Sequence, residues 1–214
     1  MSDSQSGMET ARQPTAIDLL RVERVIGAMY RVPQTPLGVL LDTQGEDLGC
    51  CRRQLERGFA PLGTTPAGQL GEIRCDLAAG ALMAIGPYAA LRAVATRVGY
   101  PDTRALRDKI GAALGISPRD LLYARSLELR IAQIEESHRR FGGRALLGGD
   151  PALQALREDL RLILAEVPVR TRRLLDGTLV LPTPAQASAE AESLAKKRLG
   201  ELRAASDHES ELLR

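Results

Sequence analysis

Residues 91–118 read LRAVATRVGYPDTRALRDKIGAALGISP, and this stretch decides the expected fold. Apolar residues recur at helical spacing on both sides of a turn that begins at Gly99. Asp102 or Thr103 is a suitable N-cap for the second helix, and Gly115 is suited to end it. The stretch therefore predicts two short helices joined by a tight turn, which is the plan of a helix-turn-helix unit.

The second predicted helix has two faces of different composition. Leu106, Ile110 and Leu114 recur at steps of four and form its apolar face. The opposite face is mostly basic, and arginine is the side chain best suited to guanine edges and phosphates. We therefore expect this face to contact duplex DNA. The expected contact residues are Thr103, Arg104, Arg107 and Lys109, with the acidic Asp108 among them.

The spacing of this unit resembles the second helix-turn-helix unit of the AraC/XylS family of bacterial transcription regulators. Members of that family carry two such units joined by a linker helix, and the resemblance covers residues 16–125, about half of the chain. It implies an all-helical domain that binds double-stranded DNA and, as in other regulators, contact with RNA polymerase. The matching positions are Val94-Ala95, Gly99-Tyr100, Leu106, Ile110 and residues 114–118, LGISP.

A first unit of the same kind lies upstream in residues 48–66, LGCCRRQLERGFAPLGTTP. In the resemblance, Gly49 is the turn glycine and Cys51 takes the N-cap position. The family order then implies that residues 51–59 form the first recognition helix, and that residues 63–66 open the linker helix, which carries Arg74 and Ala78. The expected DNA-contacting residues of this unit are Arg52, Arg53 and Arg57.

Several positions depart from the family pattern. The scaffold helix of the first unit carries two extra residues before Gly49, and Gly45 replaces the expected small-residue pairing. Gly58, Ala60 and Pro61 stand where members often have basic residues, as do Asp108, Gly111 and Ala112 in the second unit. Each missing phosphate contact lowers the salt dependence of binding by about one unit and weakens binding to every sequence alike.

The expected fold class is all-α, with three parts along the chain. Residues 1–15 are expected to be disordered, residues 16–125 to form the paired helix-turn-helix domain with its linker helix, and residues 126–214 to form a helical C-terminal region. That region combines one apolar helix face, a second helix with a/d spacing, a short extended piece and a charged terminal helix. The apolar face is formed by Leu127, Ile131, Ile134, His138 and Phe141, and the a/d spacing by Leu153, Leu156, Leu160, Ile163 and Val167. The extended piece is TLVLPTP, and the charged terminal helix comprises residues 185–214.

Composition narrows the function classes. Aromatic residues make up 3% of the chain and tryptophan is absent, which argues against binding single strands by base stacking. A net charge of +2 requires that any DNA contact come from a local basic patch. The chain has no apolar run of membrane-spanning length and no signal-peptide pattern, so we expect a cytoplasmic protein without a membrane partner.

No pattern of catalytic or metal-binding residues stands out. Cys50 and Cys51 are adjacent, which does not give the spacing of a zinc or redox site, and Cys51 is interpreted as a cap or packing residue rather than a redox sensor. His138 shares a helix face with apolar residues and is interpreted as a packing or half-exposed residue rather than a catalytic base or metal ligand. We therefore expect no enzyme activity, no cofactor and no metal.

The sequence leaves two functions to distinguish. The first is a sequence-specific double-stranded DNA-binding transcription regulator, with residues 126–214 serving homodimerisation, partner binding or effector response. The second is an adaptor or structural protein that uses a degenerate helix-turn-helix domain for protein contacts and self-assembly.

Overall fold

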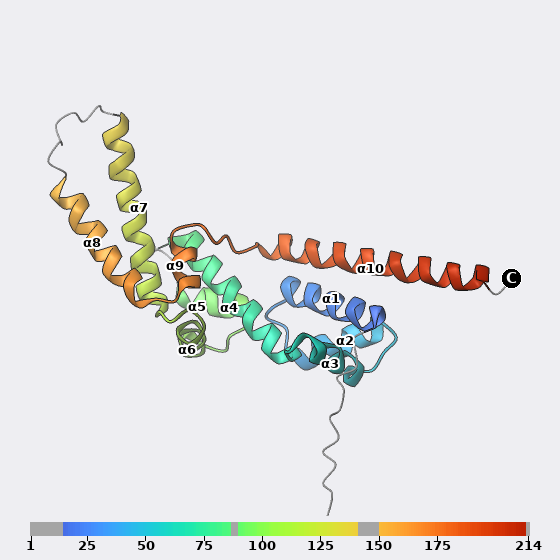
Figure 1. The fold of residues 1–214 in the computed structure, drawn as a ribbon. Helices are drawn as coiled ribbons and strands as arrows, with labels where there is room; N and C mark the ends of the chain where they lie inside the picture. The colour runs from blue at the N-terminus through green and yellow to red at the C-terminus, as the bar shows by residue number, and fades with distance from the viewer. Residues whose placement is uncertain (1–14, 87–89, 141–149, 213–214) are drawn as a thin grey trace, which may run out of the picture. The chain divides into compact units, whose positions relative to one another are not determined.

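The computed structural model describes residues 15–86, 90–140 and 150–212, with side-chain positions up to residue 204. These residues form helices and connecting turns without a β-strand, which confirms the expected all-α class (Figure 1). The expected disorder of residues 1–14, the position of Phe141 and the loop that follows it lie outside the described residues. Thr15, which was included in the expected disorder, is instead the ordered N-cap of the first helix.

The chain divides into two compact units. Unit 1 comprises residues 1–71 and 185–214, and unit 2 comprises residues 72–184. Position 125, where the sequence pattern changes, lies inside one continuous helix, α7 (Pro118–Arg140). The long helix α4 (Pro66–Ile85) contributes its first residues to unit 1 and the remainder to unit 2.

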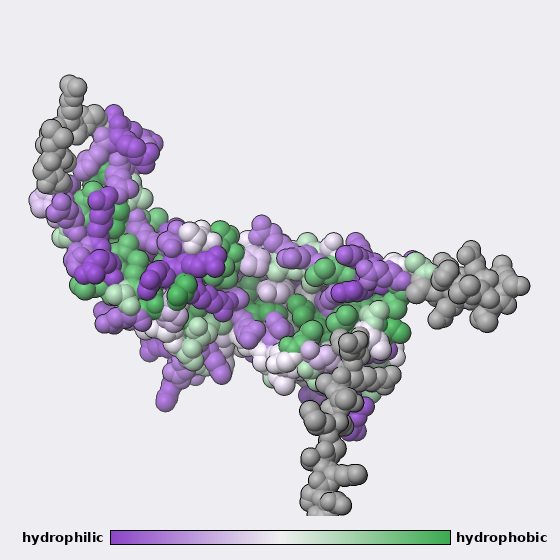
Figure 2. All heavy atoms as spheres, in the orientation of Figure 1, coloured by the Kyte–Doolittle hydropathy of each residue, from purple (hydrophilic) through white to green (hydrophobic). Residues whose placement is uncertain are grey.

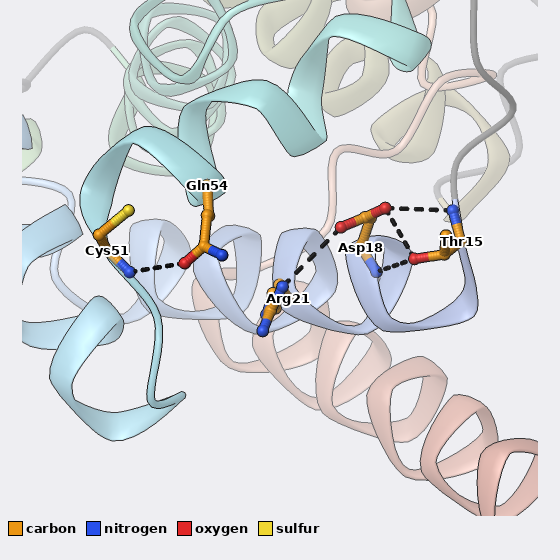
Figure 3. Close-up of polar contacts among 5 residues, drawn as sticks. All are labelled: Thr15, Asp18, Arg21, Cys51 and Gln54. Carbon is orange, nitrogen blue, oxygen red and sulfur yellow. Dashed lines mark hydrogen bonds and ion pairs between the residues drawn. The ribbon is translucent and has the colours of Figure 1, made fainter.

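Unit 1 is built around the first helix of the chain. Thr15 caps this helix by accepting a hydrogen bond from the Asp18 N–H, and the Asp18 carboxylate accepts one from the Thr15 N–H in return (Figure 3). Val22, Val25 and Met29 are buried on one face. The helices of the unit are α1 (Ala16–Arg31), α2 (Leu37–Asp47), α3 (Arg52–Phe59), a 3-10 turn (Ala60–Leu62), the start of α4, and α10 (Pro184–Leu212).

The C-terminal helix α10 lies along α1 within unit 1 (Figure 1). Its buried side chains are small, and a Cβ at Gly27 of α1 would lie 3.4 Å from the Ala191 Cβ. Arg31 of α1 binds Glu192 of α10 at 2.5 Å, and Arg198 of α10 lies 3.5 Å from Glu23. The two helices are therefore joined by close backbone approach flanked by partly exposed ion pairs.

Unit 2 contains the second helix pair and most of the C-terminal region. Its core is formed by buried aliphatic residues from every helix of the unit, among them Leu82, Leu106, Leu121 and Leu175. The helices are α5 (Leu91–Val98), α6 (Thr103–Leu114), α7, α8 (Pro151–Glu166) and α9 (Val169–Leu175), together with the larger part of α4.

Helices α7 and α8 form an antiparallel hairpin. The residues with a/d spacing in α8 are buried or half-buried, and they pack on α7 of the same chain. Arg157 of α8 binds Glu135 of α7 at 2.7 Å across the hairpin. Figure 2 shows apolar side chains between the two helices and charged side chains along their outer edges. The partner of the a/d stripe is therefore found within the chain.

Candidate nucleic-acid interface

The helix pairs α2–α3 and α5–α6 are connected by turns of the same type. In each, a glycine after the first helix has a positive φ, 59° at Gly49 and 88° at Gly99. The next N–H then bonds back five residues: Cys50 N–H to the Gly45 carbonyl at 2.9 Å, and Tyr100 N–H to the Ala95 carbonyl at 2.9 Å. This is the hydrogen bond of a Schellman motif, which ends a helix and redirects the chain.

Each second helix then starts at a capping residue. Asp102 is the N-cap of α6, and its carboxylate accepts a hydrogen bond from the Ala105 N–H at 2.8 Å. Cys51 is the N-cap of α3, and its N–H donates to the Gln54 side chain at 2.9 Å (Figure 3). The predicted starts of both helices are confirmed, and Asp102 rather than Thr103 is the cap of α6.

The buried positions of α3 and α6 also correspond. Leu55 and Leu106 lie four residues after their caps and are 1% and 0% exposed. Phe59 and Ile110 lie eight residues after their caps and are fully buried. This periodicity fixes which side chains of each helix face solvent.

The basic residues of α3 differ in their availability. The guanidinium of Arg52 binds Glu56 at 2.8 Å, and this contact raises its pKa. Arg52 also reaches back over α2, because a Cβ at Gly38 would lie 3.3 Å from its Nη1. Arg53 and Arg57 are exposed and, within the described part of the chain, form no ion pair. They are the available cations of this helix.

The outward face of α6 is close to the prediction. Arg104, Arg107 and Lys109 are exposed and form no ion pair with any described residue, whereas Thr103 is half-buried. Asp108 is exposed as well. It lies six residues after its N-cap, and the residue six positions after the cap of α3 is Arg57. Asp108 therefore places a negative charge where the other helix carries a positive one.

The predicted contact residues fall into two sets, one on each unit. Arg52, Arg53 and Arg57 share α3 in unit 1. The other set, Thr103, Arg104, Arg107 and Lys109, shares α6 in unit 2. Each unit thus presents one short helix with a mainly basic outer face.

Two departures from the family pattern have steric reasons in unit 1. A Cβ at Gly45 would lie 2.7 Å from the Cys50 carbonyl oxygen, so the turn leaves no room for a side chain there. A Cβ at Gly58 would lie 3.0 Å from Val22 Cγ2, because α3 packs closely on α1 at this buried position. A basic residue could not occupy position 58 without separating these helices. Pro61 lies in the 3-10 turn that follows α3, as expected of a residue that ends the helix.

Helix α9 adds residues that the sequence pattern did not reveal. The Thr171 hydroxyl is fully buried and donates a hydrogen bond of 2.6 Å to the Leu114 carbonyl at the end of α6. Arg170 binds Asp76 of α4 at 2.6 Å. Pro168 could have indicated the start of α9, because proline is common at the beginning of a helix. Nothing in the α9 sequence VRTRRLL, however, indicates that α9 packs against α6.

A buried cluster of titratable groups lies behind the turn of unit 2. Burial raises the pKa of the Cys75 thiol to about 11 and that of the Tyr100 hydroxyl to about 12. Among the described residues the Tyr100 hydroxyl has no hydrogen-bond partner. Cys75 is therefore a protonated core residue at neutral pH.

The remaining residues singled out in the sequence form no chemical centre. Cys50 is half-buried, Cys51 is exposed, and both are free thiols. His138 is partly exposed, with Nε2 3.7 Å from an Asp150 carboxylate oxygen. The described ranges contain no group of three or more His, Cys, Asp and Glu side chains that could hold a metal ion.

Comparison of the chain with protein-family models, curated proteins and solved structures finds no match. In the part of the chain that the structure describes, every helix is too short or too polar to span a bilayer.

Proposed function

We propose that the protein is a sequence-specific, double-stranded DNA-binding transcription regulator in which α3 and α6 are the recognition helices of two helix-turn-helix units. The observation that carries this proposal is the shared geometry of the two pairs. Both have a left-handed turn glycine, the same backward hydrogen bond and buried residues four and eight positions after the cap. This geometry presents the outer face of a short second helix, as a major-groove reader requires.

The charges on these helices support contact with DNA. Arg53 and Arg104 are each the second residue of their helix, and the first turn of a recognition helix is the part that contacts base edges. Arginine donates two parallel hydrogen bonds to guanine O6 and N7 or to a phosphate. Arg57, Arg107 and Lys109 supply further positive charge on the same helices.

The same charges also limit the expected affinity. Glu56 neutralises Arg52, and Asp108 opposes the phosphates next to Arg104 and Arg107. Binding through about five available cations gives a moderate dependence on salt, because each phosphate contact contributes about 0.9 to the slope of log affinity against log salt concentration.

We further propose that the protein works in the cytoplasm, contacts RNA polymerase and uses its second half for homodimerisation, partner binding or effector response. In this chain the second half is residues 126–214. Its a/d stripe packs on α7, so a homodimer would use the outer faces of the hairpin, where Leu129 and Leu162 are 45% and 55% exposed.

An adaptor or structural protein is the second candidate, and Asp108 favours it. A carboxylate at the centre of a recognition face opposes a phosphate but suits an arginine or lysine of a protein partner. In that function the two basic helices bind protein, and the hairpin supports self-assembly.

Selection of bound fragments from a random pool of duplex DNA separates the two functions. The regulator is expected to enrich a defined sequence. Changing Arg104 and Arg107 together to alanine should then reduce affinity for the selected duplex much more than affinity for random DNA. Equal losses of affinity for the selected duplex and for random DNA would show that α6 does not read bases. A folded protein that enriches no sequence would favour the adaptor.

A further inference from the structure

The C-terminal end of α6 is held by a helix from the other half of the sequence. α6 ends at Leu114, and Gly115 follows with a φ of 65°. The Leu114 carbonyl accepts the Thr171 hydroxyl at 2.6 Å, and the Thr171 side chain is 0% exposed. A hydrogen bond made in full burial between residues 57 positions apart fixes the two helices in register.

This contact fills a specific need of α6. The last four carbonyl groups of a helix have no partner within it, and a buried one left without a hydrogen bond is destabilising. Thr171 supplies the missing donor from the third position of α9. Helix α6 has 12 residues, and a helix of this length depends for its order on contacts with the rest of the fold.

Two further contacts hold α9 at this place. Pro168, the N-cap of α9, lies so close to Gly115 that a Cβ there would come within 2.6 Å of the proline Cδ. In addition, Arg170 of α9 forms an ion pair with Asp76 of α4 at 2.6 Å. Asp76 is largely buried, and burial raises its pKa although Arg170 lowers it. Helix α9 is thus bound to α4 and α6 at once.

We propose that Thr171 is a positioning residue for the second recognition helix. Its hydroxyl fixes the end of α6 and so holds Arg104, Arg107 and Lys109 in the geometry that reads DNA. This inference rests on the proposed function, and it makes α9 a structural part of the DNA-binding domain. The DNA-binding domain then extends beyond residues 16–125.

The test compares Thr171→Val with Thr171→Ser in the full chain. Valine keeps the shape of threonine but cannot donate, whereas serine keeps the hydroxyl. Two readouts are needed: affinity for the duplex selected from the random pool, and hydrogen exchange of the amides at the end of α6 without DNA. Leu153→Ala is the matched control, because it removes a buried side chain of unit 2 in the hairpin, away from α6.

For Thr171→Val we expect about tenfold weaker binding and about tenfold faster exchange at the end of α6, which corresponds to about 1.4 kcal/mol. Thr171→Ser and Leu153→Ala should bind like the wild type at a temperature where each is folded. If Thr171→Val does not fold, Arg170→Gln replaces it, with about threefold weaker binding expected from the loosened α9.

Wild-type affinity and exchange in Thr171→Val would overturn the inference. Equal losses in Thr171→Ser and Thr171→Val would also overturn it, because the hydroxyl would then not be the cause, and wild-type affinity in a folded Arg170→Gln protein would count against it in the same way. If the wild-type chain binds no DNA, the proposed function fails. The exchange measurement then tests only whether Thr171 anchors the end of α6. Unchanged exchange in Thr171→Val would show that it does not.

Discussion

Arg53 and Arg104 occupy equivalent positions in helices of different units. Each is the second residue of its helix, and each is followed two residues later by a fully buried leucine, Leu55 or Leu106. Both arginines are exposed, and neither forms an ion pair with a described residue. The two units therefore present the same side chain at the same point of the same local fold.

This equivalence predicts similar effects of substitution. Arg53→Ala and Arg104→Ala should each weaken binding to the selected duplex by roughly 5- to 150-fold, the range expected when a base or phosphate contact of about 1–3 kcal/mol is lost. Fluorescence anisotropy with labelled duplex measures this loss. Arg130→Ala is the control, since it removes an exposed arginine of α7 that forms no ion pair with any described residue. A loss in the control as large as in the two variants would show a general charge effect.

Asp108 provides the opposite test. Asp108→Asn removes a negative charge from the outer face of α6 and should tighten binding by a few-fold at low salt, because repulsion from the phosphates is lost. The effect should shrink as salt is raised. Asp159→Asn removes an exposed carboxylate of α8 and should leave affinity unchanged. Weaker binding by Asp108→Asn would instead mean that Asp108 makes a favourable contact with the ligand.

The turn of the first unit predicts a contrast between two glycines. Gly45→Ala brings a Cβ against the Cys50 carbonyl and should lower the free energy of unfolding by about 1–3 kcal/mol. Gly111 lies in α6 with open space around a Cβ, so Gly111→Ala should raise that free energy by about 0.5–1 kcal/mol. Urea denaturation measures both. Stabilisation by Gly45→Ala would contradict the close approach of α2 to the turn.

Removal of the Tyr100 hydroxyl is predicted to stabilise the protein. Its hydroxyl is buried without a hydrogen-bond partner among the described residues, so Tyr100→Phe should raise the free energy of unfolding by about 1 kcal/mol. Tyr123 is 51% exposed, and Tyr123→Phe should have almost no effect. Thermal unfolding of the two variants beside the wild type decides the comparison. A loss of stability in Tyr100→Phe would indicate that the hydroxyl does have a partner.

The boundaries of α5 and α6 could be predicted because the signals that set them are local. Asp102 caps through a residue three positions away, and Gly99 and Gly115 take left-handed conformations that few other residues adopt. The exposure of Arg104 and Arg107 followed from the same periodicity. The pairing of Arg52 with Glu56 could also have been predicted, since residues four apart on a helix are neighbours.

Contacts between distant segments could not be predicted. Helix α9 has 7 residues, too few for an apolar period, and the role of Thr171 depends on a carbonyl 57 residues away. The packing of α10 on α1 joins opposite ends of the chain through Gly27 and Ala191, and small residues of this kind do not identify their partner. Gly58 was interpreted as a missing phosphate contact, but it packs against α1. The sequence around a glycine does not show which distant helix it contacts, so this packing role could not be predicted either.

The most direct test of the central claim is the affinity of the wild-type chain for its selected duplex across a salt series. Binding through about five phosphate contacts predicts that affinity falls by roughly 500-fold between 50 and 200 mM salt. The fall should be smaller in the Arg53→Ala, Arg104→Ala double variant. A folded protein that binds no duplex at 50 mM salt, or whose affinity does not change with salt, would contradict the account.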